Sequence, residues 1–180
     1  HEFRDIFKEK LDLHHIPALS NVLYSEDILF PIADFYLKKE RWNEAIEVYE
    51  EMETIGALQG RGAEYYQKLG YALQKNKKYA EAIDAYLKAD TLKPDNIWNN
   101  RHLAICYRLN RNYQAALSYY KKVEEATPED TNVIFHIGSC LAELGQYEEA
   151  ANYFFKLDFI ESNCIKAWRG IGWCSFISRK

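Results

Sequence analysis

The stretch YAEAIDAY at residues 79–86 returns as YQAALSYY at residues 113–120 and as YEEAANYF at residues 147–154. Every copy starts with tyrosine, carries alanine at its fourth position and ends in tyrosine or phenylalanine, and successive copies start 34 residues apart. A period of this length is typical of proteins built from stacked repeats, in which no single unit can bury its own apolar face. The chain is therefore predicted to be an array of similar units.

Other segments repeat in the same register. A pair made of a large apolar residue and a small residue recurs in the first half of each unit. These pairs are Leu69-Gly70, Leu103-Ala104, Ile137-Gly138 and Ile171-Gly172. A further copy of the second-half pattern, Trp42, Ala45 and Tyr49, lies 37 residues upstream of the next one, which indicates a three-residue insertion in the loop around 56–60.

This pattern resembles the tetratricopeptide repeat, in which W-x2-LG-x2-Y precedes A-x3-F and a final proline. The resemblance covers about residues 25–180. It implies an all-α fold, a right-handed α-solenoid of antiparallel helix pairs. Small residues such as Gly70 and Ala82 let two helices approach closely, and the large aromatic residues fill the space between hairpins. Pro94 and Pro128 end the second helix of two units.

We expect four complete units and the first helix of a fifth. The units are placed at about 26–59, 63–96, 97–130 and 131–164, with the additional helix at 165–180. The predicted helices cover 26–39, 42–54, 61–76, 79–91, 97–110, 113–125, 131–144, 147–159 and 165–178. Residues 1–24 are predicted to form an N-terminal helical cap or a degenerate repeat, because the apolar residues between Phe3 and Leu11 share one helical face outside the repeat register.

Three of the four cysteines, Cys106, Cys140 and Cys174, occupy one equivalent position of successive units. Equivalent atoms of neighbouring units are about 8–10 Å apart, which is too far for a disulfide or a shared zinc ion. We therefore predict core packing for these three and a free thiol for Cys164, which lies in a turn between units. Unpaired cysteines indicate a reducing compartment, and we expect a cytoplasmic protein.

The sequence offers no residues from which an enzyme can be argued. It contains neither a phosphate-binding glycine loop nor a zinc-ligand spacing, and no Ser-His-Asp set is indicated. His102 and His136 lie one repeat apart and are interpreted as groove residues, so we expect no metal and no cofactor. The N-terminal segment is too charged for a signal peptide, and the absence of an apolar run of 18 residues argues against a membrane span.

Charge is unevenly distributed between the two helices of each unit. The first helices of the second to fifth units carry most of the positive charge, whereas the second helices and their exits are acidic. In tetratricopeptide proteins the first helices line the concave groove, so the resemblance implies a basic groove with aromatic side chains. The expected groove residues are Lys68, Tyr71, Lys75, Trp98, Arg101, His102, Arg108, Phe135, His136, Lys166, Arg169 and Trp173. Such a groove suits an acidic peptide with apolar anchors.

Two other occupants of the groove stay open at this stage. One is another part of the same full-length protein, and the other is a nucleic acid, against which the acidic outer layer argues. The tetratricopeptide clamp for acidic chaperone tails is not expected, because pairs such as Arg101 and Ile105 do not match its lysine and asparagine. The predicted function is a protein-interaction scaffold, and the alternative is a regulatory or recruiting segment of a larger enzyme or sensor.

The last predicted helix, 165–180, is too apolar for the polar helix that normally caps a solenoid. Its apolar residues include Trp168, Ile171, Trp173 and Phe176. We therefore expect that further repeats follow it or that this end packs on another chain, which includes self-association through 165–180.

Overall fold

The computed structural model describes residues 26–54, 56 and 61–178. Within these ranges the chain forms nine helices and no strand. The helices are α3 (Glu26–Lys38), α4 (Trp42–Thr54), α5 (Gly62–Lys75), α6 (Tyr79–Leu92), α7 (Ile97–Leu109), α8 (Tyr113–Ala126), α9 (Thr131–Glu143), α10 (Tyr147–Ile160) and α11 (Ile165–Ile177). Their bounds agree with the predicted helices to within one residue at each end, and the predicted cap at 1–24 lies outside the described residues.

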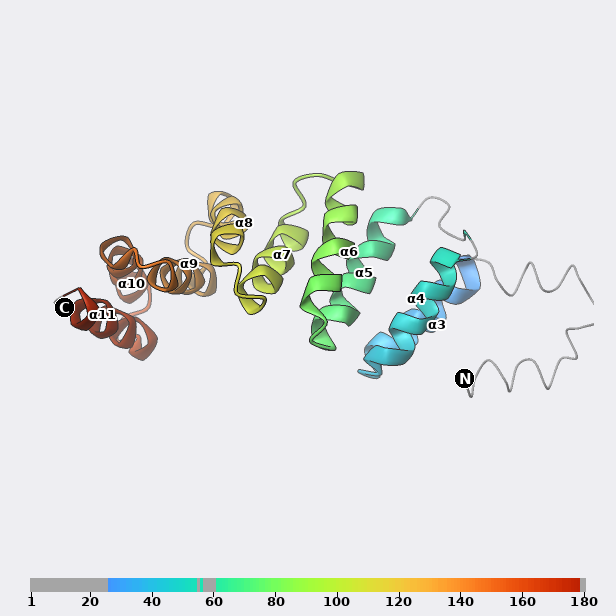
Figure 1. The fold of residues 1–180 in the computed structure, drawn as a ribbon, viewed down its shortest axis with the longest axis horizontal. Helices are drawn as coiled ribbons and strands as arrows, with labels where there is room; N and C mark the ends of the chain where they lie inside the picture. The colour runs from blue at the N-terminus through green and yellow to red at the C-terminus, as the bar shows by residue number, and fades with distance from the viewer. Residues whose placement is uncertain (1–25, 55, 57–60, 179–180) are drawn as a thin grey trace, which may run out of the picture.

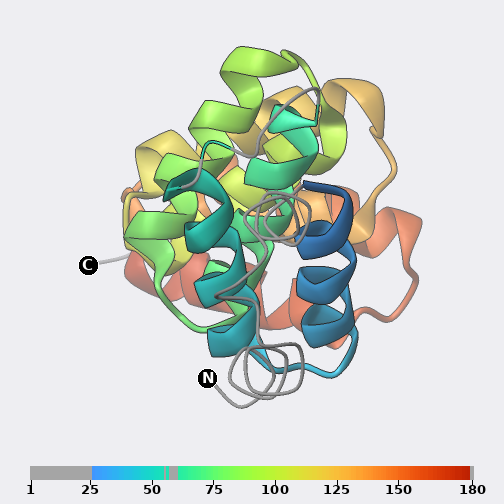
Figure 2. The ribbon, with the colours of Figure 1, turned by 90° about the vertical axis from the view of Figure 1, so that its right-hand side faces the viewer.

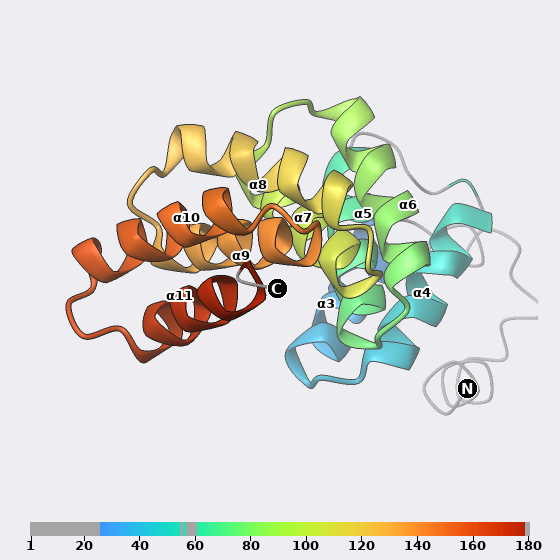
Figure 3. The same ribbon diagram turned by 60° about the vertical axis from the view of Figure 1, so that its left-hand side comes forward.

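The helices form a solenoid of stacked pairs. Each helix packs against the helices before and after it, so that α3 to α10 make four antiparallel pairs and α11 packs on α10. Figure 1 shows the pairs following one another along the long axis of the molecule, from α3 and α4 to α11. Figure 2 looks along the stack from the α3 and α4 end, and Figure 3 brings forward the other end, where α11 lies beside α9 and α10. The predicted all-α solenoid is confirmed.

The residues that define the repeat form the core. Ala82, Ala116 and Ala150 are fully buried, and so is Tyr86, which follows the first of them by one helical turn. A Cβ atom on Gly70 would lie 2.9 Å from the ring of Tyr86, which is closer than van der Waals contact allows. The small residues therefore bring the two helices of a pair together, as the sequence predicts.

The turn inside each pair uses one backbone position with a left-handed conformation. The residues there are Glu40, Lys77, Arg111 and Gly145, with φ angles of 56°, 62°, 61° and 79°. Left-handed backbone is unfavourable for residues with a Cβ atom and almost free for glycine. Three of the four turns therefore hold a strained non-glycine residue at a position suited to glycine.

The cysteines belong to the packed interior. Cys106, Cys140 and Cys174 are buried in the core, and Cys164 is buried directly before α11. All four are free thiols. The predicted packing role of the first three is confirmed. None of the helices in the described part of the chain is long and apolar enough to cross a lipid bilayer.

The final helix exposes the face that the second helix of a pair covers elsewhere. A Cβ atom on Gly138 would lie 2.9 Å from the Phe154 ring, whereas one on the equivalent Gly172 would have no atom of the described chain within 4 Å. Trp168 is 58% exposed, although the equivalent Ile134 in α9 is fully buried. Helix α11 therefore presents an apolar surface without a covering helix in the described structure.

Candidate binding site on the inner helices

Successive pairs meet at junctions that are built from the same three repeat positions. One residue comes from the end of a first helix, one from the middle of the second helix and one from the next first helix. These junction residues are Gln74, Tyr86 and His102, then Arg108, Tyr120 and His136, then Ala142, Phe154 and Gly170. The three sets differ in chemistry, and the difference determines where the inner surface is open.

The junction of α5, α6 and α7 is filled by a hydrogen-bonded polar network. The Tyr86 hydroxyl donates to Gln74 Oε1 at 3.1 Å, and His102 Nδ1 lies 2.8 Å from the same oxygen. The imidazole is stacked beside the Tyr86 ring at a centroid distance of 5.7 Å and an interplanar angle of 27°. Burial, reinforced by the charges of Arg101 and Lys75, lowers the pKa of His102 to about 4, so the ring is neutral at pH 7.

The junction of α7, α8 and α9 repeats the ring stacking, with Arg108 in place of Gln74, but without hydrogen bonds of the Tyr120 hydroxyl and His136 Nδ1 to a described residue. His136 is stacked beside Tyr120 at 5.5 Å and 25°. Burial and the nearby Arg108 and Lys166 lower the pKa of His136 to about 4. Burial raises the pKa of Tyr120 to about 12, and the Arg108 guanidinium partly opposes this shift. Both histidines are therefore neutral packing groups between repeats.

The junction of α9, α10 and α11 is open. Ala142 has no long side chain, Phe154 has no hydroxyl group, and Gly170 has no ring. A hollow of about 570 Å³ lies here. Its lining residues are Phe135, Ser139, Ala142 and Glu143 of α9, Tyr147 and Phe154 of α10, and Lys166, Arg169, Gly170 and Trp173 of α11.

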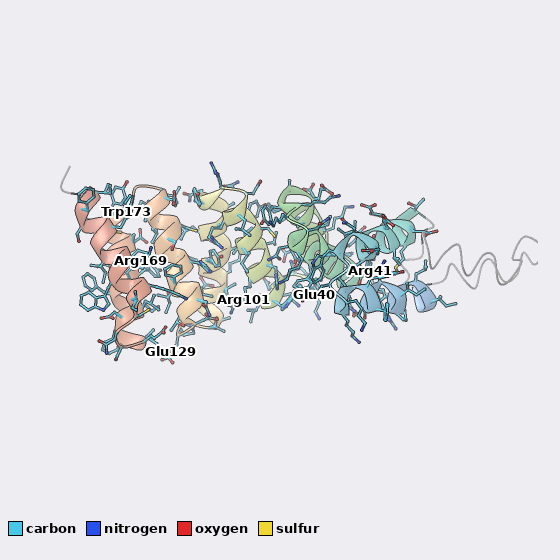
Figure 4. The ribbon with its side chains drawn as sticks, turned by 90° about the horizontal axis from the view of Figure 1, so that it is seen from below. Glu40, Arg41, Arg101, Glu129, Arg169 and Trp173 are labelled. Carbon is cyan, nitrogen blue, oxygen red and sulfur yellow. The ribbon has the colours of Figure 1, made fainter. Side chains whose placement is uncertain are left out.

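Two cations and an exposed tryptophan border this hollow. Lys166 Nζ lies 5.8 Å from the centroid of the Phe135 ring, and Trp173 is 59% exposed. Figure 4 shows Arg169 and Trp173 on the same helix at the end of the stack. Among the described residues, neither Lys166 nor Arg169 has a carboxylate within ion-pair distance. Glu143 is the one carboxylate in the lining, at the end of α9.

Two other predicted groove cations are each held by an acidic residue of a neighbouring repeat. Lys68 Nζ lies 2.7 Å from Asp34 Oδ2 and 3.1 Å from Glu64 Oε1, and it borders a smaller hollow of about 300 Å³. The Arg101 guanidinium lies 2.7 Å from Asp130 Oδ2. Burial of Asp130 opposes ionisation, but Arg101 and the backbone N–H of Val133 outweigh it and lower its pKa. These two cations join repeats to one another.

A second aromatic group covers the inner side of α5 and α7. The centroid of the Trp98 ring lies 4.0 Å from that of His102 and 6.3 Å from that of Tyr71. Lys75 Nζ lies 5.3 Å from the centroid of the Tyr71 ring. Trp98 is 42% exposed. His102 occupies the junction behind this group.

Sequence models described as tetratricopeptide repeat match residues 29–60, 63–96 and 108–171. The chain belongs to the tetratricopeptide repeat family. These matches cover most of the four helix pairs and the start of the fifth unit. No curated protein sequence matches the tetratricopeptide chain.

Solved tetratricopeptide structures have the same architecture. MamA from Desulfovibrio magneticus RS-1, residues 41 to the end, is similar with a TM-score of 0.76 at 18% identity, over 85% of each chain. A MamA structure from MSR-1 has a TM-score of 0.73 at 25% identity, over 89% of this chain and 88% of that one. YrrB, described as a tetratricopeptide protein with an unusual peptide-binding site, has a TM-score of 0.76 at 20% identity, over 90% of this chain and 84% of that one. These likenesses support the architecture of an all-α solenoid of helix pairs.

The sequence predicted some of the residues that line the hollow but not others. Phe135, Lys166, Arg169 and Trp173 were predicted, and the structure brings them together at one junction. Ala142 and Gly170 were not predicted. Their signal was present, because His102 and His136 are followed one repeat later by glycine rather than by a third ring.

Proposed function

We propose that this tetratricopeptide array is a protein-interaction scaffold that binds an acidic partner peptide on its inner helices, at the open junction of α9, α10 and α11. The observation that carries the proposal is the pair of cations, Lys166 and Arg169, beside a hollow lined by aromatic rings. Its volume of about 570 Å³ lies within the range of about 300–1,000 Å³ that is usual for ligand sites.

The state of the cations favours this junction over the sites of Lys68 and Arg101. An incoming carboxylate would have to displace Asp34 to reach Lys68, or Asp130 to reach Arg101. At Lys166 and Arg169 it meets cations that have no ion-pair partner among the described residues, so their charge is available. Glu143 is the one carboxylate in the lining and repels acidic groups, so we expect the acidic residues of the peptide to lie beside Lys166 and Arg169.

The apolar walls supply the second half of the recognition. Phe135, Phe154 and Trp173 surround the hollow from three helices. Binding energy at peptide interfaces concentrates on a few large side chains seated in such pockets. The peptide-binding site named for YrrB is consistent with a peptide ligand for this fold. The four free thiols fit a reducing compartment, and we place the scaffold in the cytoplasm.

Isothermal titration with the acetylated, amidated peptide DEDFED tests the proposal. The variant with Lys166→Glu and Arg169→Glu replaces two attractions with two repulsions, at about 0.5 kcal/mol for each exposed pair. The sum of about 2 kcal/mol corresponds to a roughly 30-fold weaker Kd. The matched control carries Lys93→Glu and Lys122→Glu, two exposed residues outside the hollow, and has the same net charge.

We expect the control variant to bind within about twofold of the wild type at physiological salt, because screening removes interactions beyond about 8 Å. An equal loss of affinity in both variants would mean that only net charge attracts the peptide. That result, or no binding of DEDFED to the wild type at millimolar concentration, contradicts the proposed function.

A further inference from the structure

We infer that the open junction accepts one unsubstituted aromatic or large aliphatic side chain of the bound partner, which lies against Phe154 in the hollow between α9, α10 and α11. The inference rests on the proposed function, because it names the side chain that the peptide inserts. Its basis is the comparison of three equivalent junctions within one chain.

The three junctions differ in the side chains that fill them. Gln74 and Arg108 extend a long side chain into their junctions, and His102 and His136 add a ring. At the third junction Ala142 and Gly170 carry neither group. The Phe154 ring takes the place next to Gly170, 2.6 Å from the position of a Cβ atom there, and a hollow stays open beside Phe154 and Ala142. This space suits a planar ring or a side chain of similar size beside the aromatic residue of the second helix.

The three junctions also differ in the polar atoms that they offer. The first junction satisfies its phenol and its imidazole through Gln74. The second leaves the Tyr120 hydroxyl and His136 Nδ1 without a hydrogen bond to a described residue and has only the nearby Arg108 guanidinium. Ala142 and Phe154 offer no polar atom in the equivalent places. A hydroxyl group or an imidazole carried into this part of the hollow would lose its hydrogen bonds to water without replacement. The inserted side chain is therefore apolar, with a phenyl ring preferred over a phenol.

Close packing against two glycines fixes the Phe154 ring, which forms one wall of the hollow. A Cβ atom on Gly138 would lie 2.9 Å from Phe154, and one on Gly170 would lie 2.6 Å from the same ring. The Phe154 ring is thus held between the backbones of α9 and α11. A wall that is already fixed needs no ordering when a ligand binds, which favours recognition of one side-chain shape.

The cations at the hollow set where an acidic group of the peptide lies relative to the inserted side chain. Lys166 Nζ lies 5.8 Å from the centroid of Phe135, which itself lines the hollow. A carboxylate bound by Lys166 or Arg169 is therefore within one or two residues of the inserted side chain. The recognised feature is an acidic residue one or two positions from phenylalanine, leucine or methionine.

Small carboxylates test the inference without a peptide. The probes are 3-phenylpropionate, propionate and 3-(4-hydroxyphenyl)propionate, titrated into 15N-labelled protein while the indole N–H signals of the tryptophans are followed by NMR. Trp173 borders the hollow, and Trp98 borders a filled junction and serves as internal reference. We expect 3-phenylpropionate to shift the Trp173 signal with a low-millimolar Kd, which is usual for a ligand of this size, and to leave Trp98 in place.

The relative affinities decide between the alternatives. We expect propionate to bind at least tenfold more weakly and the hydroxylated probe about fivefold more weakly than 3-phenylpropionate. The variant Ala142→Gln restores the side chain of the first junction and should weaken 3-phenylpropionate at least fivefold. Ala80→Gln, the same substitution at an exposed position of α6, should leave binding unchanged.

Equal affinity for 3-phenylpropionate and propionate, or full binding to the Ala142→Gln variant, overturns the inference. If DEDFED depends on Lys166 and Arg169 while 3-phenylpropionate leaves Trp173 unshifted, the anchor pocket is wrong and the proposed function stands. If the probe binds in the hollow and DEDFED does not bind, the pocket stands and the acidic-peptide function is wrong.

Discussion

Replacement of Gly138 by alanine should destabilise the array, whereas the same replacement at Gly172 should stabilise it. Both glycines lie inside a helix at the same repeat position. Each substitution gains about 1 kcal/mol of helix propensity. The Cβ atom at 138 would lie 2.9, 3.1 and 3.2 Å from three atoms of the Phe154 ring, whereas the Cβ atom at 172 has no neighbour within 4 Å.

The ring of Phe154 cannot move away freely, because Gly170 of α11 closes its other side. Overpacking of this kind costs about 1–3 kcal/mol. The Gly172→Ala variant should therefore gain about 1 kcal/mol, and Gly138→Ala should lie about 1–3 kcal/mol below it in free energy of unfolding. A change of 1 kcal/mol moves the Tm of a chain of this size by about 2–4 °C.

Thermal unfolding followed by far-UV circular dichroism measures this difference directly. The comparison of the two variants cancels the propensity gain and leaves the packing cost. A Gly138→Ala protein that is as stable as Gly172→Ala would refute the reasoning, since it would show that α9 and α10 separate without cost. The close approach of small residues and aromatic rings would then not explain the repeat.

Three further predictions concern other parts of the molecule. Lys77→Gly and Arg111→Gly should each raise the free energy of unfolding by about 1 kcal/mol, and Gly145→Ala should lower it by a similar amount, because all three positions have left-handed backbone; urea denaturation checks this. Burial lowers the pKa of His102 and of His136 to about 4 in the folded protein, whereas histidine in the unfolded chain has a pKa of about 6.5. The unfolded chain therefore binds protons first as the pH falls, so the contribution of the two histidines to stability is complete above pH 6.5 and is lost towards pH 4. The Tm should therefore drop between pH 7 and pH 5, and the variant with His102→Asn and His136→Asn should show a smaller drop; an identical drop contradicts the assignment. We also propose that a second copy of the chain covers the apolar face of α11 around Gly172 and Trp168, which lacks the cover that α10 gives the equivalent residues of α9. Sedimentation equilibrium should then show reversible self-association that Trp168→Glu abolishes; a monomer at high concentration contradicts this.

The fold was largely predictable, because its determinants are local and recur. Each unit has the same helix lengths and turn positions, so a helix boundary that is ambiguous in one unit can be read from the others. The burial of Cys106 and Cys140 followed from their equivalent positions alone. The pairing of Lys68 with Asp34 and of Arg101 with Asp130 did not follow, because sums of charge along a helix do not show which acid of a neighbouring helix lies opposite.

The candidate site was predictable only in part. Phe135, Lys166, Arg169 and Trp173 were identified as inner-face residues from the repeat register and the family resemblance. The hollow between them depends on what is missing at Ala142 and Gly170, and a missing side chain leaves space only if the helices do not close around it. The separation of α9 and α11, with Phe154 wedged against both glycines, is a property of the packed structure.

The central claim is that an acidic partner peptide inserts an apolar side chain at the junction of α9, α10 and α11. Intermolecular nuclear Overhauser effects between the phenyl ring of bound DEDFED and 13C-labelled alanine methyl groups test it most directly. The account predicts contacts from the phenyl protons to the methyl group of Ala142, which lines the hollow, and none to the exposed Ala80. Saturable binding of the peptide with no contact to Ala142 would contradict it.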